Sequence, residues 1–583
     1  MLHTLTRSLR ENKGPALVTV LLSALEVVFE IVIPLFMSNL IDFGIEGGSM
    51  AAVWKFGAFL LLLAAFQLAT GVLAARIAAR ASVGFAANLR EDMYDNVQTF
   101  AFSNIDKFST ASIVTRLTTD TTNVQNAFQM LMRMAIRAPV MLIFSMIVSF
   151  RISRDISMTF LIILPILALT LFFIIRSVFP VFSRVFRTYD ELNNVVQENV
   201  RGIRVVKSFN QERHEIGKFG AISERIYKDF SKGERLITLN APLMQFCIYT
   251  CMIVISWLGA KAIIASGNDP ALGLTTGNLT ALITYTMQIL SSLMMLSMVF
   301  AMLTISLSSA RRIAEVLEER SDIPQPEQPV MTVRDGAVDF DHVSFVYASK
   351  ADKKVLDDID LHIRSGETIG IIGGTGASKS SLVQLIPRLY DVTGGKLTLG
   401  GVDVRDYDLD TLRGAVAMVL QKNELFSGTI KENLRWGNEN ATDEELQHAC
   451  VLACADEFIS AMPDGYDTHI EQGGTNVSGG QKQRLCIARA LLKKPKVLIL
   501  DDSTSAVDTR TDAQIQQALS TYIPDTTKII IAQRISSVQN ADRIVVLDDG
   551  HIDAVGSHDE LLRTCEIYRE VYESQQKGGE DDA

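Results

Sequence analysis

The sequence predicts an all-α domain of six membrane-spanning helices with long cytoplasmic helical extensions, followed by an α/β domain built around a phosphate-binding loop. Six long apolar segments occupy the first half of the chain. Short β-branched segments alternate with helical patterns in the second half, as is typical of an α/β domain. Between one such strand and a helix, residues 373–381 read Gly-Gly-Thr-Gly-Ala-Ser-Lys-Ser-Ser, a composition that cradles phosphate groups.

The apolar segments are each long enough to cross a hydrocarbon core of about 30 Å. They lie at 15–41, 52–78, 128–150, 156–180, 240–265 and 277–307. The first is too long for the core of a signal peptide and is expected to remain as a spanning helix. The connections 79–127 and 181–238 are rich in Lys and Arg, whereas loop 266–276 has neither. The positive-inside rule then places these connections and both chain ends in the cytoplasm, in a multi-pass protein of the plasma membrane.

The two long connections carry charged, helix-forming sequence, which predicts that pairs of spans continue into the cytoplasm as helical hairpins. About 25 helical residues extend about 37 Å. We expect the hairpin tips near 100–112 and 205–220, where they are candidate levers between the two domains.

A change of composition divides the chain into domains. The stretch Ile-Pro-Gln-Pro-Glu-Gln-Pro at 323–329 cannot continue a helix. The predicted parts are a transmembrane domain at 1–312, a linker at 313–335, a nucleotide-binding domain at 336–575 and a disordered acidic tail at 576–583. The strands expected in the nucleotide-binding domain are Val338–Tyr347, Thr368–Gly373, Val497–Asp501, Thr527–Ala532 and Arg543–Leu547.

The glycine-rich loop predicts a site for ATP and Mg²⁺. Its backbone N–H groups meet the phosphates, Lys379 reaches the β and γ oxygens, and the Ser380 hydroxyl ligates Mg²⁺. Asp501, at the end of an apolar strand, is the expected Mg²⁺ carboxylate. Ser378 stands where the motif keeps a second glycine, so its side chain is expected to crowd the loop if that position needs a glycine-only dihedral. The loop residues predicted to contact the nucleotide are Gly373, Thr375, Gly376, Ser378, Lys379, Ser380 and Ser381.

Further motifs follow the loop in a fixed order. They are a segment containing Gln421, the run Val-Ser-Gly-Gly-Gln-Lys-Gln-Arg at 477–484, the strand ending at Asp501, and Ser-Ala-Val-Asp at 505–508. With six spans before it, this arrangement resembles the half-transporters of ATP-binding cassette (ABC) exporters over nearly the whole chain.

The resemblance implies a role for each motif. Tyr347 stacks on adenine, and Gln421 contacts Mg²⁺ or water and reports to the membrane part. The signature residues clasp the γ-phosphate of ATP held by another cassette, so a chain with one cassette has to dimerise. The residues carried over for this contact are Ser478, Gly479, Gly480 and Gln481, and Asp508 is carried over as a further nucleotide-binding residue.

Two positions depart from the family pattern. Asp502 stands where the family has a glutamate base and is one methylene shorter, and Gln533 stands where it has a histidine. An amide bonds to a phosphate but does not carry a proton as imidazolium does. The chain therefore resembles the degenerate-site subunit of heterodimeric bacterial multidrug exporters. Asp502 acting as a slow base, and chance drift at both positions, remain open.

The first and last spans contain candidate substrate residues. Glu26 and Glu30 lie one helical turn apart, and intramembrane carboxylates are functional candidates. Pairing with a neighbouring helix, or a place near the headgroups, is an equal alternative. Met294 and Met298 share a helix face suited to apolar ligands, although packing explains any single methionine as well.

The sequence thus predicts a subunit of a heterodimeric ATP-driven exporter of amphipathic drugs or lipid-like compounds. Its partners are a second half-transporter, the lipid bilayer and a small amphipathic substrate. The net charge of −11, without a basic stripe, argues against a nucleic-acid partner. A homodimeric flippase or multidrug exporter and a mainly regulatory ATP-sensing subunit remain as alternatives.

Overall fold

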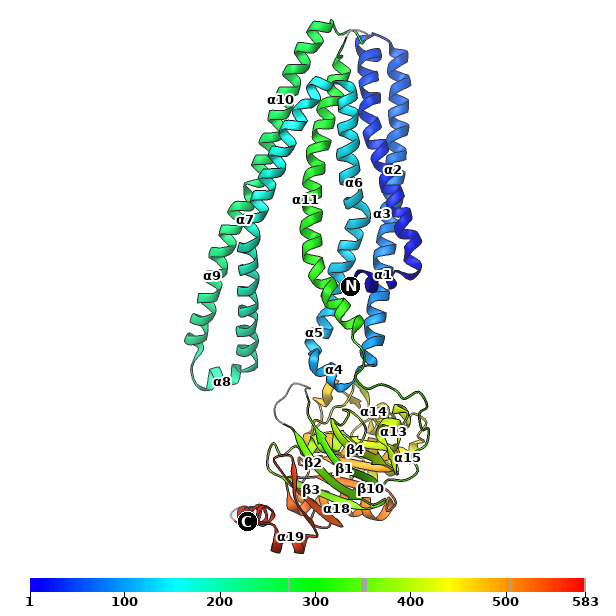
Figure 1. Ribbon diagram of the computed structural model, residues 1–583, viewed down its shortest axis with the longest axis vertical. Coiled ribbons are helices and arrows are strands. Elements are labelled where there is room, and N and C mark those ends of the chain that lie inside the picture. Colours follow the sequence, from blue (N-terminus) through cyan, green and yellow to red (C-terminus); the bar gives the residue numbers. More distant parts are fainter. Residues whose placement is uncertain (271–272, 348–353, 504, 581–583) are drawn as a thin grey trace. The chain divides into compact units, whose positions relative to one another are not determined.

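The structure, a computed structural model, describes residues 1–270, 273–347, 354–503 and 505–580 (Figure 1). The chain forms two compact units, which are described separately. The first contains Met1–Gln98 and Thr110–Glu319, and the second contains Thr99–Ser109 and Arg320–Ala583. The second unit thus includes a short segment from within the predicted transmembrane domain.

The regular elements among the described residues of the first unit are all helices, as predicted. Its elements are α1 Leu2–Arg7, η1 Arg10–Asn12, α2 Lys13–Asn39, η2 Leu40–Glu46, α3 Met50–Gln98, α5 Thr110–Thr115, η3 Arg116–Asp120, α6 Thr121–Ile152, α7 Arg154–Arg201, α8 Ile203–Ser208, α9 Glu212–Thr238, α10 Asn240–Ser266 and α11 Thr276–Glu318. Among the described residues, six continuous helical stretches are long and apolar enough to cross a membrane. The prediction of six spans is therefore confirmed.

The helices of this unit pack through narrow faces and leave broad apolar surfaces exposed. Val27 and Ile31 of α2 pack with Met141 of α6 and Tyr285 of α11. The Tyr285 hydroxyl donates a hydrogen bond of 2.6 Å to the Ile31 carbonyl. This hydroxyl would otherwise lack a hydrogen-bond partner in hydrocarbon. Outward-facing leucines such as Leu61 are 75% exposed, as expected for side chains that meet lipid.

The predicted cytoplasmic hairpins are helical. Helices α7 and α9 pair through Val195, Ile222 and Ile226, and the short α8 closes their far end (Figure 1). The other tip, near 100–112, contains α4 (Phe102–Lys107), which belongs to the second unit.

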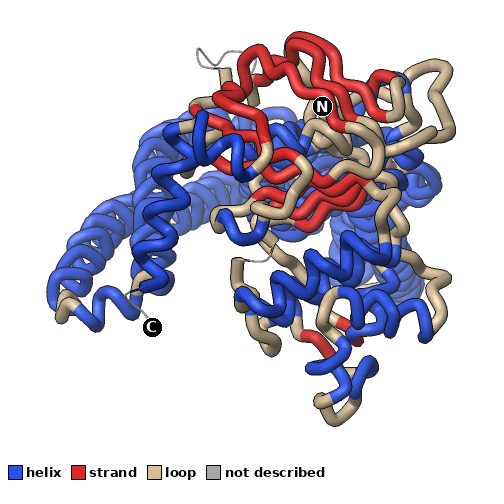
Figure 2. The backbone as a smooth tube through the Cα atoms, turned by 90° about the horizontal axis from the view of Figure 1, so that it is seen from below, coloured by secondary structure: helices blue, strands red, loops and turns tan. Residues whose placement is uncertain are grey.

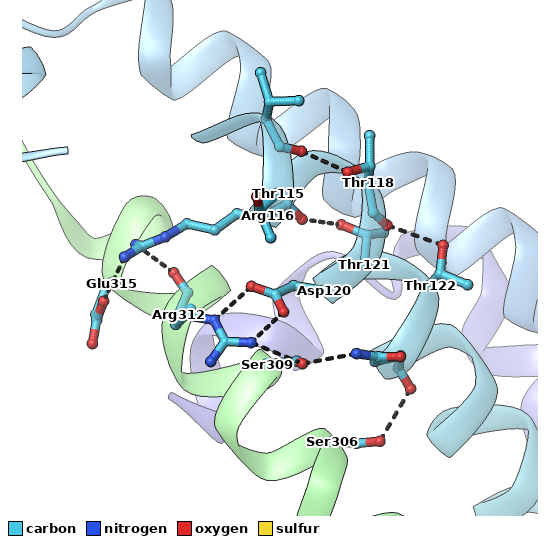
Figure 3. A network of polar contacts seen from close by, with 12 residues as sticks. Thr115, Arg116, Thr118, Asp120, Thr121, Thr122, Ser306, Ser309, Arg312 and Glu315 are labelled. Atoms are coloured by element: carbon cyan, nitrogen blue, oxygen red, sulfur yellow. Dashed lines mark hydrogen bonds and ion pairs between the residues drawn. The ribbon is translucent and has the colours of Figure 1, made fainter. Parts of the chain in front are cut away.

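A polar network joins the lower end of α11 to η3 and α6 (Figure 3). Arg312 binds both carboxylate oxygens of Asp120, one through Nε at 2.7 Å. Arg116 donates to the Arg312 carbonyl at 2.8 Å and lies 3.1 Å from a Glu315 carboxylate oxygen. Because Asp120 is buried, these bonds hold the C-terminal end of α11 against η3 and the start of α6 more firmly than exposed ion pairs would.

The described part of the second unit contains three sheets. The six-stranded sheet has the order β12-β11-β3-β10-β9-β6, the four-stranded sheet has the order β2-β1-β4-β5, and β7 pairs with β8. The strands are β1 Val338–Phe345, β2 Leu356–Ile363, β3 Thr368–Gly373, β4 Gly394–Leu399, β5 Val402–Asp403, β6 Val416–Val419, β7 Gly428–Thr429, β8 His469–Ile470, β9 Val497–Asp501, β10 Thr527–Ile531, β11 Arg543–Asp548 and β12 His551–Gly556.

Helices surround these sheets, and Figure 2 shows a group of helices beside the strands. The α-helices described after β1 in this unit are α12 Lys379–Gln384, α13 Leu409–Ala415, α14 Ile430–Arg435, α15 Asp443–Leu452, α16 Asp456–Ser460, α17 Gly479–Leu492, α18 Thr509–Tyr522, α19 His558–Thr564 and α20 Glu566–Glu580. Strands β3, β9 and β10 run parallel, and burial on both faces explains their continuous apolar sequences.

Two helices continue into segments where the sequence predicts a linker and a tail. Helix α11 continues through Glu318, six residues into the predicted linker, because buried Ile313 and Val316 keep its apolar face packed. Helix α20 continues through Glu580, where the sequence predicts a disordered tail from 576. The last three residues of that predicted tail lie outside the described part of the chain.

Candidate nucleotide site

The site lies where three parallel strands end at one edge of the six-stranded sheet. Strand β3 leads into the glycine-rich loop, β9 ends at Asp501, and β10 ends two residues before Gln533. Because carboxyl ends of parallel strands meet at the same edge, residues more than a hundred positions apart face one space.

A cavity of about 780 Å³ occupies this edge, within the size range of small-molecule sites. The structure brings together twelve of the residues that the sequence predicts for nucleotide binding, metal binding and catalysis. Those lining the cavity are Tyr347, Gly373, Thr375, Gly376, Ser378, Lys379, Ser380, Ser381, Gln421, Asp501, Asp502 and Gln533.

Lys379 and Ser380 occupy the centre of the site. The Lys379 ammonium donates to the carbonyls of Gly373 and Gly374 at 2.8 and 2.9 Å. Burial lowers the pKa of this ammonium, against the opposing influence of Asp501 and Asp502. The Ser380 hydroxyl donates to Asp501 Oδ1 at 3.0 Å. This hydroxyl–carboxylate pair offers the oxygen ligands that Mg²⁺ prefers, so the residues present fit that metal.

Ser378 adopts a left-handed backbone, with φ of 67° and ψ of 21°. This region is open to a residue with a Cβ, at a cost of about 1–2 kcal/mol. The energetic cost of serine in place of glycine at position 378 therefore comes from the backbone conformation. A Cβ at the neighbouring Gly376 would meet no atom within 4 Å, although its φ of 88° favours glycine.

Asp502 and Gln533 contact each other. Gln533 Nε2 donates a hydrogen bond of 2.9 Å to Asp502 Oδ2. Burial raises the pKa of the Asp502 carboxyl, while hydrogen bonds from Gln421 and Gln533 oppose that rise. Asp502 itself has a φ of 49°, so its position at the cavity depends on a strained backbone.

The Tyr347 ring borders the cavity and is half-exposed. Its hydroxyl lies 2.7 Å from the Ser381 hydroxyl, and its ring meets Tyr390 edge-on with centroids 5.1 Å apart. An aromatic face at this place suits stacking against a purine.

The signature residues line a separate hollow of about 330 Å³. Ser478, Gly479, Gly480 and Asp508 border it, together with Arg484. Ser478 caps α17 by accepting from the Gln481 backbone, and the Gln481 side chain accepts from the Ser478 backbone at 2.9 Å. None of these residues lines the 780 Å³ cavity, so the signature faces a different space from the phosphate loop of its own chain.

Two residues that contact the site, Gln575 and Tyr390, are not predicted from the sequence. Gln575 of α20 donates to the Gln533 carbonyl at 2.7 Å and accepts from the Ile535 backbone at 2.9 Å. Tyr390 donates to Asp106 Oδ2 of α4 at 2.8 Å, and burial with that contact raises the pKa of its hydroxyl. Neither residue belongs to a local motif, so only the packing of distant segments identifies it.

Known proteins resemble both parts of the chain. A family model described as the ABC transporter transmembrane region matches residues 16–294, and the ABC transporter model matches residues 356–505. The uncharacterized ABC transporter ATP-binding protein YfiB of Bacillus subtilis is 36% identical over 558 residues, which cover 96% of each chain. The chain belongs to the ABC transporter family.

Two further likenesses agree with this ABC transporter assignment. An uncharacterized ABC transporter ATP-binding protein of Mycobacterium tuberculosis, Rv1273c, is 32% identical over 99% of this chain and 98% of its own. The solved structure of a bacterial Atm1-family ABC exporter with ATP bound superposes with a TM-score of 0.81 at 24% identity, covering 97% of this chain and 99% of that one. The chain has the exporter fold, with one transmembrane domain and one cassette that implies ATP binding.

In the membrane part of this ABC transporter, the predicted substrate carboxylates are paired. Arg137 of α6 donates to Glu26 Oε1 at 2.8 Å and to Glu30 Oε2 at 2.5 Å. This geometry favours the alternative in which both carboxylates pair with a neighbouring helix. Met294 and Met298 are 44% and 60% exposed on α11, so they remain available to a ligand or to neighbouring helices.

Proposed function

We propose that this chain is the subunit of a heterodimeric ATP-driven exporter that holds a slowly hydrolysing ATP site. The observation that carries the proposal is the hydrogen bond between Asp502 and Gln533. These side chains fill the positions of the family's base and switch histidine, and each engages the other. The cassette lies in the cytoplasm in this proposal, together with both chain ends.

ATP fits the 780 Å³ cavity with its adenine against Tyr347 and its triphosphate along residues 373–381. Backbone N–H groups of the loop and the Lys379 ammonium bind the phosphate oxygens. Ser380 and Asp501 would hold Mg²⁺, with Gln421 beside them, and the metal would neutralise charge on the β and γ oxygens.

Hydrolysis at this site is slow because the water-activating group is short and already engaged. Asp502 accepts a hydrogen bond from Gln533, and its carboxylate is withdrawn by about 1 Å relative to a glutamate, a displacement that can cost about 100-fold. The raised pKa of Asp502 makes it a stronger base than an ordinary aspartate. Geometry therefore limits this site more than basicity does.

The intact signature supports a division of labour between two chains. Ser478, Gly479 and Gly480 line a hollow apart from the phosphate loop of their own chain. In the proposed heterodimer they close over ATP on the partner, where a complete base and switch residue hydrolyse it. The cargo is a small amphipathic compound that enters from the membrane or cytoplasm.

The experiment is affinity purification of this chain from its native membrane, followed by ATPase assay of each fraction. We expect a second half-transporter in equal amount, and slow turnover when this chain is expressed alone. A homodimer with the turnover of an ordinary exporter would contradict the proposal and establish the homodimeric alternative.

A further inference from the structure

A second cavity, of about 450 Å³, lies in the first unit between α2, α3 and α6. Its α3 wall carries Leu68, Val72 and Ala75, and Gln67 adds one polar side chain. The remaining wall is charged, because Glu26 of α2 and Arg133 of α6 face the same space. An apolar surface beside a few convergent polar groups is the usual composition of a small-molecule site.

The charges of this cavity are only partly paired. Arg137 satisfies Glu26 through Oε1, and no donor to Glu26 Oε2 occurs among the described residues. Arg133 lies one helical turn before Arg137, and its side chain forms no hydrogen bond or ion pair with any residue that the structure describes. The cavity therefore presents one guanidinium and one carboxylate oxygen that are both available.

The position of Gly71 brings the carboxylate to the cavity. A Cβ at Gly71 would lie 3.2 Å from Glu26 Oε1 and 3.7 Å from Oε2, so a side chain there would crowd the carboxylate.

Arg133 lies about 28 Å along the helix from the outer end of α6, at about 1.5 Å per residue. In a hydrocarbon core of about 30 Å this places both charges toward the cytoplasmic leaflet.

A ligand with a single charge fits this arrangement poorly. A cation that approaches Glu26 also approaches Arg133, and an anion that approaches Arg133 also approaches Glu26. Like charges in a weakly polar surrounding repel more strongly than in water. The four charged groups Glu26, Glu30, Arg133 and Arg137 sum to zero, so a ligand of net charge zero leaves the cavity neutral.

We propose that the cavity binds a zwitterionic amphiphile. Its ammonium group contacts Glu26 Oε2, its phosphate or carboxylate contacts Arg133, and its alkyl chain lies along Leu68 and Val72. The assignment of this molecule as cargo rests on the proposed export function, whereas its binding does not. The same headgroup chemistry belongs to resident phosphatidylethanolamine, which the experiment separates from cargo.

Binding is measured on the full-length protein in nanodiscs of anionic lipid, with its partner if one co-purifies. The probes are lysophosphatidylethanolamine, the anionic lysophosphatidic acid and the cationic dodecylamine. We expect the zwitterion to bind about tenfold more tightly than either probe that carries charge of one sign, because only the zwitterion makes both charge-assisted contacts. Equal binding of all three probes would overturn the proposal.

Arg133→Gln is expected to remove this preference, and Arg80→Gln is the matched control. Arg80 is an exposed arginine on α3 that does not line the cavity. Val72→Trp, which fills the cavity from its apolar wall, tests the same site if Arg133→Gln fails to fold. Undiminished zwitterion binding in a folded Arg133→Gln or Val72→Trp protein would also overturn the proposal.

Transport into inverted vesicles then distinguishes cargo from resident lipid. ATP-dependent uptake of labelled lysophosphatidylethanolamine that is lost in Arg133→Gln supports cargo. Tight binding without uptake overturns the cargo assignment and establishes a resident lipid. ATPase activity of the same preparation is measured in parallel, so that failure of the proposed exporter function is recognised separately from failure of this site.

Discussion

Gln533 Nε2 donates a 2.9 Å hydrogen bond to Asp502 Oδ2, so the two residues that depart from the ABC pattern contact each other. The two departures therefore meet at one place in the structure. An amide at 533 donates to the carboxylate at 502, and a partly buried carboxylate with such a donor is more stable than one without it. The contact gives a physical reason for the two substitutions to occur together.

Restoring the family residues is expected to activate this site. Asp502→Glu with Gln533→His should raise phosphate release by about 100-fold, since glutamate reaches the attacking water and imidazole stabilises charge on the γ-phosphate. The assay uses the purified complex with the partner's catalytic base removed. Gln533→Ala is the control, because it frees Asp502 without supplying an imidazole. Equal activity in both variants would contradict the explanation.

Changes in the signature are expected to impair the complex more than changes at Asp502. Ser478→Ala removes a cap of α17 at about 1 kcal/mol and, in the proposed heterodimer, a contact with the γ-phosphate of ATP on the partner. In the proposed heterodimer, Asp502→Asn alters only the site that hydrolyses ATP slowly. We expect ATPase of the complex to fall at least about tenfold for Ser478→Ala and less than twofold for Asp502→Asn.

Thr442→Ala is the stability control for the signature variant. Thr442 caps α15 in the same manner as Ser478 caps α17, and it lines neither the cavity nor the hollow. Its complex should keep full ATPase activity. Similar losses in Ser478→Ala and Asp502→Asn would show that this chain's own site is the catalytic one.

Gln575 is expected to hold the segment that carries Gln533. Gln575→Ala removes two hydrogen bonds, to the Gln533 carbonyl and the Ile535 backbone, and should cost about 1–3 kcal/mol of local stability. We expect ATP trapped at this site after a chase to decrease several-fold. Gln576→Ala, at an exposed neighbour, is the matched control and should retain the nucleotide. Identical retention in both variants would contradict the role.

Asp501 is expected to make Mg²⁺-dependent nucleotide binding sensitive to moderately acidic pH. Burial raises the pKa of this carboxyl above its ordinary value of 3.8, although Ser380 opposes the rise. The protonated form does not bind the metal, so binding should be lost as pH falls through the raised pKa. Titration of Mg²⁺-ATP binding against pH measures the midpoint. A midpoint at or below 3.8 would contradict the expectation.

Arg137 is expected to be essential for the stability of the membrane domain. Arg137→Gln leaves Glu26 and Glu30 without their donor, and breaking a buried ion pair costs about 3–5 kcal/mol. Thermal unfolding in detergent should therefore shift to a lower temperature. Arg151→Gln, in the last turn of α6, is the control and should leave unfolding unchanged. Restored stability in the triple variant with Glu26→Gln and Glu30→Gln would confirm the charge argument.

The sequence predicts the helices and strands well because burial imposes a regular pattern on their apolar residues. The strands at Thr368–Gly373 and Val497–Asp501 have the predicted bounds, since both are continuous apolar runs in a buried parallel sheet. Helix ends are predicted less well. Helix α11 passes the predicted boundary because its last turns pack with residues distant in the chain, and local sequence does not contain that information.

By itself, the sequence determined the six spans, the phosphate loop, the signature and the substitutions at 502 and 533. Length, apolar periodicity and motif spacing are local properties, and each carries its own chemical reason. Tertiary structure alone decided that Gln533 donates a hydrogen bond to Asp502 and that Gln575 donates one to the Gln533 carbonyl. It also decided that Arg137 pairs with both Glu26 and Glu30. The Arg133 side chain has no such partner among the described residues. Those relationships join residues from different elements, so they exist only once packing has brought the elements together.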